Sequence, residues 1–331
     1  MTSPPSVTAV VATYNRRAAL PGFLDALLAG GGLHEVVVAV DGSEDGSLAY
    51  LEDRAREDAR IVPLLVDHQG QFGALDAGAH AASGEVVLFL DDDVRADPEM
   101  VACHAGHHAA RDDLVVLGYM PPVLPDRPTA AQFATVLYEK EYEDRCRSWE
   151  HDPELILHNL WGGNFSLRRE AYLAMGYEPL RPPAGAEGIR LYNQDRGFGL
   201  ECLRHGLTGV FDRRASALHL HERTLEGFLR DSYGQGACRV LLAHLHPDLL
   251  DPATGGVPRS RAGAALDRLG ARERAGQAAA RTTSGAARAA IRLGSLRAAL
   301  LTARAARAAQ IARGAADMSA LLGATAPAEA A

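Results

Sequence analysis

The sequence predicts an α/β fold in which a mostly parallel, Rossmann-like sheet is flanked by helices and followed by an α-helical C-terminal extension. Four short apolar runs alternate with helical patterns over the first hundred residues, and an Ala- and Arg-rich stretch with helical spacing fills the end of the chain. Because strands that are apolar throughout are covered on both faces, this alternation indicates a parallel sheet with right-handed crossovers.

The elements of this sheet can be placed in order along the chain. Each of two predicted strands stops at a turn-forming cluster: Asp-Gly-Ser at 41–43 follows the second strand, and an aspartate triplet follows the fourth. Glycines at 30–32 and Ser-Gly at 83–84 end two of the helices. The predicted strands cover 6–14, 35–40, 61–66 and 85–90, and the predicted helices cover 16–29, 48–59 and 74–82.

The rest of the chain is more varied. A Pro-rich stretch at 121–128 and a glycine-flanked turn at 161–169 predict loops that shape a site on the sheet, and 193–205 has a helical pattern. From about residue 258, the spacing of Ile and Leu predicts one or two helices, with a break near Ser284-Gly285. The last nine residues are predicted to be disordered.

Composition excludes a disordered chain and restricts the partners. Of the 331 residues, 47% are hydrophobic, which is enough for a substantial core. The formal net charge of -8 is uneven, because residues 1–258 carry -16 whereas residues 259–313, with 12 Arg, carry +10. The acidic body argues against general nucleic-acid binding. The basic segment can contact a membrane surface, a nucleic acid or the acidic body itself.

The cysteine and hydropathy patterns bear on location. The four Cys are far apart and form no C-x-x-C, so neither a disulfide framework nor a zinc ribbon is predicted. The first residues lack a basic region before their short apolar run, and no run approaches 18 apolar residues. We expect a cytoplasmic protein, and for the extension either peripheral contact with the inner face of the membrane or packing on the body or a dimer partner.

The triplet Asp91, Asp92 and Asp93 is the strongest chemical feature. Ligands of open α/β sheets bind outside the carboxyl ends of strands. Three adjacent carboxylates repel one another there unless a cation neutralises them. Asp91 and Asp93 can point the same way and form a D-x-D site for Mg²⁺ or Mn²⁺ and a diphosphate. The alternative is a solvated turn that caps a helix.

Other polar residues allow both a functional and a structural interpretation. Asp41 can accept hydrogen bonds from a nucleobase or ribose, or it can form a turn that caps a helix. Asp195 precedes an amphipathic helix and can act as a general base or cap that helix. His219 and His221 alternate, so a strand would put both on one face, where one imidazole completes the metal site or serves only the fold.

Three further side chains carry weaker signals. Trp161 lies beside a glycine and can stack on an acceptor sugar or belong to the core. His104 and His108 lie one helical turn apart beside Cys103, which is a spacing that could bind a metal. Because no further ligands are evident, a structural role is favoured for these histidines.

Six motifs follow one another along the chain: V-V-A-T-Y-N-R at 10–16, V-D-G-S-E-D-G-S at 40–47, L-D-D-D-V at 90–94, W-G-G-N-F-S-L-R-R at 161–169, Q-D at 194–195 and H-L-H at 219–221. Their order and spacing resemble family 2 glycosyltransferases of the GT-A fold over about residues 6–245. The resemblance implies a glycosyltransferase domain at 1–250, with a nucleotide-binding half at 1–100 and an acceptor and catalytic half at 101–250, before the extension at 251–331.

The resemblance implies an inverting enzyme that uses a nucleotide-diphosphate sugar and a divalent metal, Mn²⁺ or Mg²⁺. By match, Asp195 would be the catalytic base, and Asp93 would bind the metal with His219 or, less favourably, His221. Asp41 would hold the base of the nucleotide. The residues that would contact the nucleotide or donor are Thr13, Tyr14, Asn15, Asp41, Asp91, Asp92, Gly163 and Asn164.

The chemistry of inversion agrees with this set of residues. One base must deprotonate the acceptor hydroxyl as it attacks the anomeric carbon opposite the leaving group, through an oxocarbenium-like transition state. A metal can stabilise the charge that develops on the departing nucleoside diphosphate, so no protein acid is required. One metal site and one base are therefore the minimal set.

Two departures from the family pattern concern the position before the presumed base and the contacts with the donor. Gln194 stands where the family often has Glu, and Ala-Leu-Asp-Ala-Gly at 74–78 replaces the common Ala-Arg-Asn-x-Gly. The loss of an Arg and the gain of Asp76 can alter contacts with the diphosphate or sugar. The identity of the donor therefore stays open.

We expect a hexosyltransferase-type enzyme whose acceptor is a glycan, a lipid-linked intermediate or a secondary metabolite. One alternative is a sugar nucleotidyltransferase, which would have a Gly-rich phosphate loop after the first strand, but residues 13–17 contain no glycine. The other is a non-catalytic nucleotide-binding protein. No G-x-G-x-x-G follows an early strand, which argues against a dehydrogenase.

Overall fold

The computed structural model describes residues 4–220, 222–250 and 273–325. The chain divides into two structural units. The first is made of Met1–Val123, Glu141–Pro179 and Phe198–His221, and the second of Leu124–Lys140, Leu180–Gly197 and Glu222–Ala331. The sequence predicts a disordered end at 323–331, but residues 323–325 continue the last helix, and 326–331 lie outside the described residues. The stretch at 251–272 and His221 also lie outside them.

An eight-stranded sheet forms the centre of the first unit, in the order β3-β2-β1-β4-β7-β6-β8-β5. The first four strands pair in parallel, whereas β7 runs antiparallel to both of its neighbours, and β5 runs antiparallel to β8. The strands are β1 (Val7–Thr13), β2 (Leu33–Asp41), β3 (Ile61–Val66), β4 (Val86–Leu90), β5 (Val94–Ala96), β6 (Leu114–Tyr119), β7 (Asn164–Arg168) and β8 (Thr208–His219).

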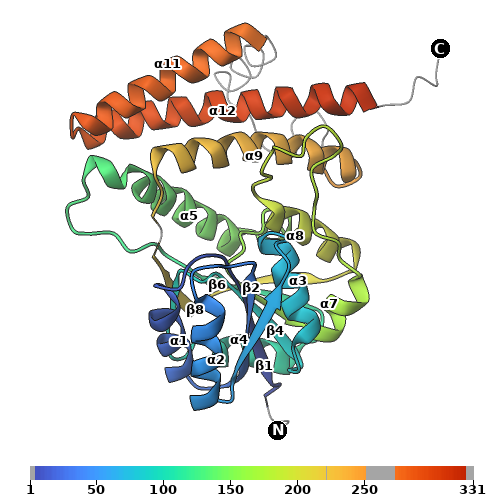
Figure 1. Cartoon of the computed structure of the whole chain (residues 1–331). Helices are drawn as coiled ribbons and strands as arrows, with labels where there is room; N and C mark the ends of the chain where they lie inside the picture. Colours follow the sequence, from blue (N-terminus) through green and yellow to red (C-terminus); the bar gives the residue numbers. More distant parts are fainter. Residues whose placement is uncertain (1–3, 221, 251–272, 326–331) are drawn as a thin grey trace, which may run out of the picture. The chain divides into compact units, whose positions relative to one another are not determined.

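Helices flank this sheet, so the predicted α/β fold class is confirmed (Figure 1). The central strands have little exposed surface, and Val36 to Val40 of β2 have none. Strands buried on both faces need helices on both sides, which explains why the apolar runs do not alternate with polar residues. The helices are α1 (Leu20–Ala29), α2 (Ser47–Glu57), α3 (Gln71–Ala81), α4 (Met100–Ala110), α6 (Leu155–His158) and α7 (Arg169–Met175), with α5 (Phe133–His151) and α8 (Gln194–Arg204) passing from one unit into the other.

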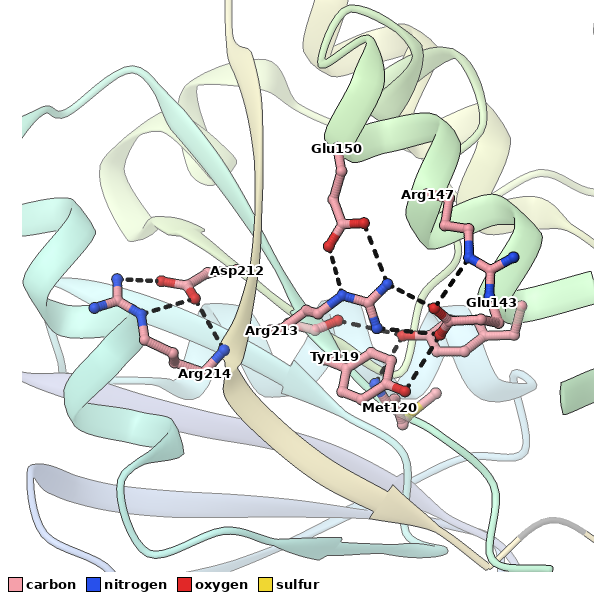
Figure 2. A network of polar contacts seen from close by, with 10 residues as sticks. Tyr119, Met120, Glu143, Arg147, Glu150, Asp212, Arg213 and Arg214 are labelled. Atoms are coloured by element: carbon pink, nitrogen blue, oxygen red, sulfur yellow. Dashed lines mark hydrogen bonds and ion pairs between the residues drawn. The ribbon is translucent and has the colours of Figure 1, made fainter. Parts of the chain in front are cut away.

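A bulge divides β8 into two parts. Gly118 of β6 pairs with Asp212, but the next residue, Tyr119, pairs with Ser216, so three additional residues of β8 lie between them. Figure 2 shows Arg213 extending toward α5, where its guanidinium binds Glu143, with Nη2 to Oε1 at 2.9 Å. The bulge therefore links β8 to α5 and lets the end of the strand take its own register.

Three long helices dominate the second unit: α9 (Leu225–Leu245), α11 (Glu273–Arg292) and α12 (Leu296–Thr325). They lie side by side, with α12 between the other two (Figure 1). A Cβ added to Gly236 of α9 would lie 2.0 Å from the carbonyl oxygen of Ile311, so only glycine permits this approach to α12. No helix in the described part of the chain is both long and apolar enough to cross a bilayer.

The predicted break near Ser284-Gly285 is wrong. Helix α11 continues through both residues, and the chain turns instead at Gly294, whose φ is +72°. Ser284 is buried within the helix face, whereas a positive φ at Gly294 lets the chain leave α11 without strain. A Ser-Gly pair therefore does not interrupt a helix whose other residues are mostly Ala and Arg.

Candidate functional site

Asp91, Asp93 and His219 converge at the carboxyl end of β4. Each offers one ligand atom, and these atoms all lie within 4.8 Å of one another. The two aspartates follow β4 directly, while the pairing of Val94 with His219 brings the end of β8 beside them. The distance from Asp93 Oδ1 to His219 Nε2 is 3.3 Å. The three residues that the sequence assigned to the metal and diphosphate side therefore do lie together.

Asp91 is held from two sides. Gln71 Nε2 donates to its Oδ1 at 2.9 Å, and the backbone N–H of Asp91 donates to the carbonyl oxygen of Gly163 at 3.1 Å. Gly163 has a φ of +101°, and a Cβ there would lie 2.6 Å from Asp91 Oδ2. Glycine is therefore required at this position, because any side chain would displace the carboxylate.

Asp92 is the buried member of the aspartate triplet. Thr13 Oγ1 donates to Asp92 Oδ2 at 2.8 Å, and Arg16 Nε lies 3.1 Å from Oδ1. Burial raises the pKa of Asp92 to about 6, although Arg16 and Thr13 act in the opposite direction. Thr13 and Asp92, both predicted to contact the nucleotide, thus bind each other and join the end of β1 to the end of β4.

Arg16 is a site residue that the sequence interpretation missed. Besides Asp92, it reaches Asp93, with Nη2 3.5 Å from Oδ2. Its side chain is 42% exposed, so the guanidinium lies at the rim of the acidic cluster. The signal in the sequence was its place within the motif at 10–16, three residues after β1 ends.

A second group of polar side chains lies where β2 and β3 end. Asp41 is buried, and its carboxylate accepts hydrogen bonds from the backbone N–H groups of Gln69 at 2.7 Å and Gly70 at 3.0 Å. His68 Nδ1 lies 3.0 Å from Asp41 Oδ2. The ring of His68 lies beside that of Tyr14, with 4.6 Å between centroids. Two exposed rings thus border a preoriented carboxylate.

Asn15 connects this group to the loop after β2. Its φ is +51°, a left-handed conformation that Asn tolerates, and its Oδ1 accepts from the N–H of Glu44 at 3.0 Å. Its own N–H donates to Ser43 Oγ at 2.9 Å. The predicted Tyr14, Asn15 and Asp41 are therefore neighbours, and His68 is an addition that the end of the third strand could have suggested.

Asn164 is held by a buried chain of hydrogen bonds. Its Nδ2 donates to the carbonyl oxygen of Ala215 at 2.9 Å, which leaves Oδ1 to accept from His104 Nε2 at 2.9 Å. His104 Nδ1 then accepts from Ser166 Oγ, and that hydroxyl accepts from His108 Nε2, each at 2.8 Å. Both amide atoms of Asn164 are engaged inside the protein, so its neighbour Gly163 is the residue that borders the acidic cluster.

His104 and His108, the two histidines in this series of hydrogen bonds, stay neutral. Burial lowers the pKa of His104 to about 4 and that of His108 to about 3. Their partners are a hydroxyl and an amide, which supply no negative charge to stabilise a proton. The ring nitrogens hold Ser166 and Asn164 in fixed orientations and thereby anchor β7 against α4.

Trp161 stacks on Tyr142 within the first unit. Their ring centroids are 5.6 Å apart and their planes differ by 9°. Tyr142 is buried, and its hydroxyl accepts from the N–H of Met120 at 2.7 Å. The Trp161 ring is partly exposed and is therefore oriented by a fixed aromatic platform, so its role at the acceptor stays a prediction.

Asp195 lies in the first turn of α8, in the part of that helix that belongs to the second unit. It is partly exposed, and α8 begins at Gln194, so Asp195 lies inside the helix and not before it. A carboxylate in the first turn is favoured by the helix dipole. Its role as a catalytic base also stays a prediction.

Solved structures with a similar fold are GT-A glycosyltransferases. The mannosyltransferase PcManGT from Pyrobaculum calidifontis, in complex with GDP-Man and Mn²⁺, matches 94% of this chain and 88% of its own, with a TM-score of 0.57 and 18% sequence identity. TarS 1-349 from S. aureus matches 96% of this chain and 92% of its own, with a TM-score of 0.50 and 17% identity. The chain therefore has the GT-A fold.

Sequence comparison adds the family. The glycosyl transferase family 2 model matches residues 8–174, and the chain belongs to this family. An undecaprenyl-phosphate 4-deoxy-4-formamido-L-arabinose transferase from Aeromonas hydrophila is 35% identical over 101 residues, which are 29% of this chain and 31% of that protein. One of the same name from Yersinia pestis is 28% identical over 169 residues, 46% of this chain and 51% of that protein. The matches span about half the length of these relatives or less.

Proposed function

We propose that the chain transfers a sugar from a nucleotide-diphosphate sugar to an acceptor hydroxyl, with inversion at the anomeric carbon and with the help of Mn²⁺ or Mg²⁺. The observation that supports this most is the convergence of Asp91, Asp93 and His219 at a strand end of a family 2 glycosyltransferase. PcManGT, which has the same fold, was solved with GDP-Man and Mn²⁺, which agrees with a donor and a cation of these classes.

The ligands at the acidic cluster suit such a cation. Two carboxylates and one imidazole combine hard oxygen ligands with a nitrogen ligand that Mn²⁺ accepts readily. The cation would be held by Asp91, Asp93 and His219 and would supply Lewis-acid stabilisation of the leaving diphosphate. Gly163 keeps the Asp91 carboxylate in place, and Arg16 at the rim of the cluster offers a guanidinium to phosphate oxygens.

Asp41 and its neighbours form the proposed subsite for the nucleotide base. Backbone N–H groups orient the buried Asp41 carboxylate, and a carboxylate can accept hydrogen bonds from the N–H groups of a base. Tyr14 and His68 supply adjacent ring faces on which a planar base can stack. Thr13 and Asp92 contribute by fixing the strand ends between this subsite and the acidic cluster.

For the acceptor side, we propose that Asp195 deprotonates the attacking hydroxyl and that Trp161 stacks on the acceptor. Inversion at a hydroxyl acceptor needs a base on the face of the sugar opposite the leaving group and no protein acid. The names of two curated relatives include undecaprenyl phosphate, which favours an acceptor on a lipid carrier over a free glycan or secondary metabolite. A lipid phosphate attacks through an oxygen that is already ionised, so the role of Asp195 as a base applies to a hydroxyl acceptor.

Calorimetric titration of GDP and UDP with and without Mn²⁺ tests the metal site. Asp93→Ala should abolish the increase in nucleotide affinity that Mn²⁺ causes in the wild-type protein. Asp53→Ala is the matched control, because it removes an exposed carboxylate of α2 far along the sheet from β4. Unchanged Mn²⁺ dependence in Asp93→Ala would contradict the proposal.

Release of nucleoside diphosphate from a sugar donor tests the reaction. Asp195→Asn should lower turnover by about 10²- to 10⁴-fold while the donor binds as before. Pyrophosphate as the product would instead indicate a nucleotidyltransferase, and nucleotide binding without turnover of any donor would indicate a binding protein. Loss of donor binding by folded Asp195→Asn would contradict the role as a base.

A further inference from the structure

Helix α11 carries a row of arginines on one side. Arg274, Arg281 and Arg288 are spaced by seven residues, and seven residues turn an α-helix by 20° less than two full turns. Arg292 follows Arg274 by five full turns. All four side chains are exposed and therefore project from the helix within a sector of about 40°.

The inner side of α11 is made of small residues. Ala280, Ala287 and Ala290 are buried, and Ala287 and Ala290 belong to an apolar cluster with Ala299 and Ala303 of α12. Alanines on both helices allow α11 and α12 to pack closely. The contact with α12 thus fixes the rotation of α11 and directs the arginine row outward.

The positive charge of this helix pair has little compensation. Residues 274–316 contain eight Arg and no Asp or Glu. Within the described ranges, Arg288 is the member of the row with an ion pair, at 3.2 Å from Glu226 of α9. The side chains of Arg274, Arg281 and Arg292 are exposed.

Two large apolar side chains are exposed among these cations. Leu293 follows Arg292 at the turn between the helices and is 83% exposed. Leu301 of α12 is 59% exposed and lies one helical turn from both Arg297 and Arg304, which are exposed as well. Exposed leucines interspersed with exposed arginines are the composition of helices that lie at a membrane surface.

We propose that the α11–α12 pair, through its arginine row with Leu293 and Leu301, binds the surface of a membrane that contains anionic lipids. Guanidiniums pair with lipid phosphates, and the leucines leave water for the acyl boundary. A nucleic-acid backbone satisfies the arginines but gives the leucines no apolar contact. The proposal goes beyond sugar transfer, because neither the donor site nor the cation takes part in it.

Co-sedimentation of the full chain with vesicles tests this surface. Wild-type protein should bind phosphatidylcholine vesicles that contain phosphatidylglycerol and should not bind vesicles of phosphatidylcholine alone. Each arginine at an anionic surface contributes about fivefold to the partition coefficient. The triple variant Arg274→Gln, Arg281→Gln and Arg292→Gln should therefore bind about a hundredfold more weakly.

A matched control removes the same charge elsewhere. Arg56→Gln, Arg127→Gln and Arg147→Gln change three exposed arginines outside the helix pair and should retain most of the binding. Leu293→Ser with Leu301→Ser should lower binding at a salt concentration that screens the charges. Circular dichroism checks that each variant keeps its helical content.

Three outcomes would overturn the proposal. One is failure of the wild-type chain to bind the anionic vesicles. Another is equal loss of binding in the row variant and in the control variant, since that would reflect net charge alone. The third is that the protein binds a DNA duplex through the arginine row and does not bind vesicles. That result would assign the surface to nucleic acid. None of these readouts involves a sugar donor, so they are separate from the test of transfer.

Discussion

Two histidine clusters on the same sheet differ in what surrounds their buried rings. His219 lies at the end of β8 beside Asp91 and Asp93, whereas His104 and His108 lie between α4 and β7 beside a hydroxyl and an amide. Burial lowers the pKa of His104 and that of His108, whose hydrogen-bond partners carry no charge. The comparison teaches that the charge of the neighbours, and not the depth of the histidine, separates a candidate cation ligand from a structural hydrogen-bonding group.

The largest expected effect lies at the acidic cluster. His219→Ala should lower the rate of nucleoside diphosphate release about 10³-fold, because loss of the cation removes several kcal/mol of transition-state stabilisation. The thermal midpoint of the metal-free protein should change little. If His219→Ala greatly lowered that midpoint but kept the activity per folded molecule, His219 would have a structural role like that of His104. The two histidine clusters would then not differ in function.

The opposite balance is expected for His104→Ala. The free energy of unfolding should fall by about 3 kcal/mol, because a cavity forms and Asn164 and Ser166 lose a buried partner. Urea titration measures this change. His107→Ala, on the same helix, should cost about 1 kcal/mol or less, because its contact with Asp212 is partly exposed. Equal costs for the two variants would refute a special role of the buried chain.

Gly163 connects the two clusters, since it precedes Asn164 and contacts Asp91. Gly163→Ala should lower the free energy of unfolding by about 2 kcal/mol through its positive φ and should weaken Mn²⁺ binding by displacing the Asp91 carboxylate. Gly22→Ala in α1 is the control, because a Cβ there meets nothing within 4 Å. If Gly163→Ala bound Mn²⁺ as tightly as the wild-type protein does, Gly163 would not connect the two clusters.

The smallest expected effect per residue is a pH dependence of stability. The folded-state pKa values of His104 and His108 lie below the ordinary value of 6.5, so their contribution is complete above pH 6.5 and is lost as pH falls toward 4 and 3. At pH 5.5 each ring should cost about 1.4 kcal/mol relative to neutral pH. Urea titrations at pH 7.5 and 5.5 measure this, and His104→Gln should remove about half of the difference. An unchanged difference would mean that the ring is not buried neutral.

The sequence predicted the parts of the fold that local pattern controls. The apolar runs at 6–14, 35–40, 61–66 and 85–90 correspond to β1, β2, β3 and β4. Strand β7 was missed because five residues after two glycines resemble a turn until β4 and β6 pair with them. Helix α9 was missed because the polar residues and glycines at 230–232 and 234–236 obscure the apolar pattern in its middle.

Prediction of the candidate site from the sequence has the same limit, because local pattern does not reveal which elements are neighbours. Asp91 and Asp93 follow a predicted strand, so their place at the sheet edge could be derived from the chain order. The contacts of His68 and Arg16 depend on which strands are neighbours, which the periodicity of one strand does not reveal. His104 required the pairing of α4 with β7, across 60 residues of sequence, before its hydrogen bond to Asn164 could be known.

The bulge in β8 divides that strand into two parts with different registers. Before it, β8 pairs in parallel with β6 as far as Asp212. After it, Ser216 pairs with Tyr119 of β6, and the last residues of β8 pair with β5 in the antiparallel sense, with His219 N–H bound to the carbonyl oxygen of Pro121 at 2.9 Å. The position of His219 is thus set by local partners and not by counting from the start of the strand. We therefore expect a change in the length of the bulge at Arg213 and Arg214 to leave the pairing of His219 with Val94 unchanged.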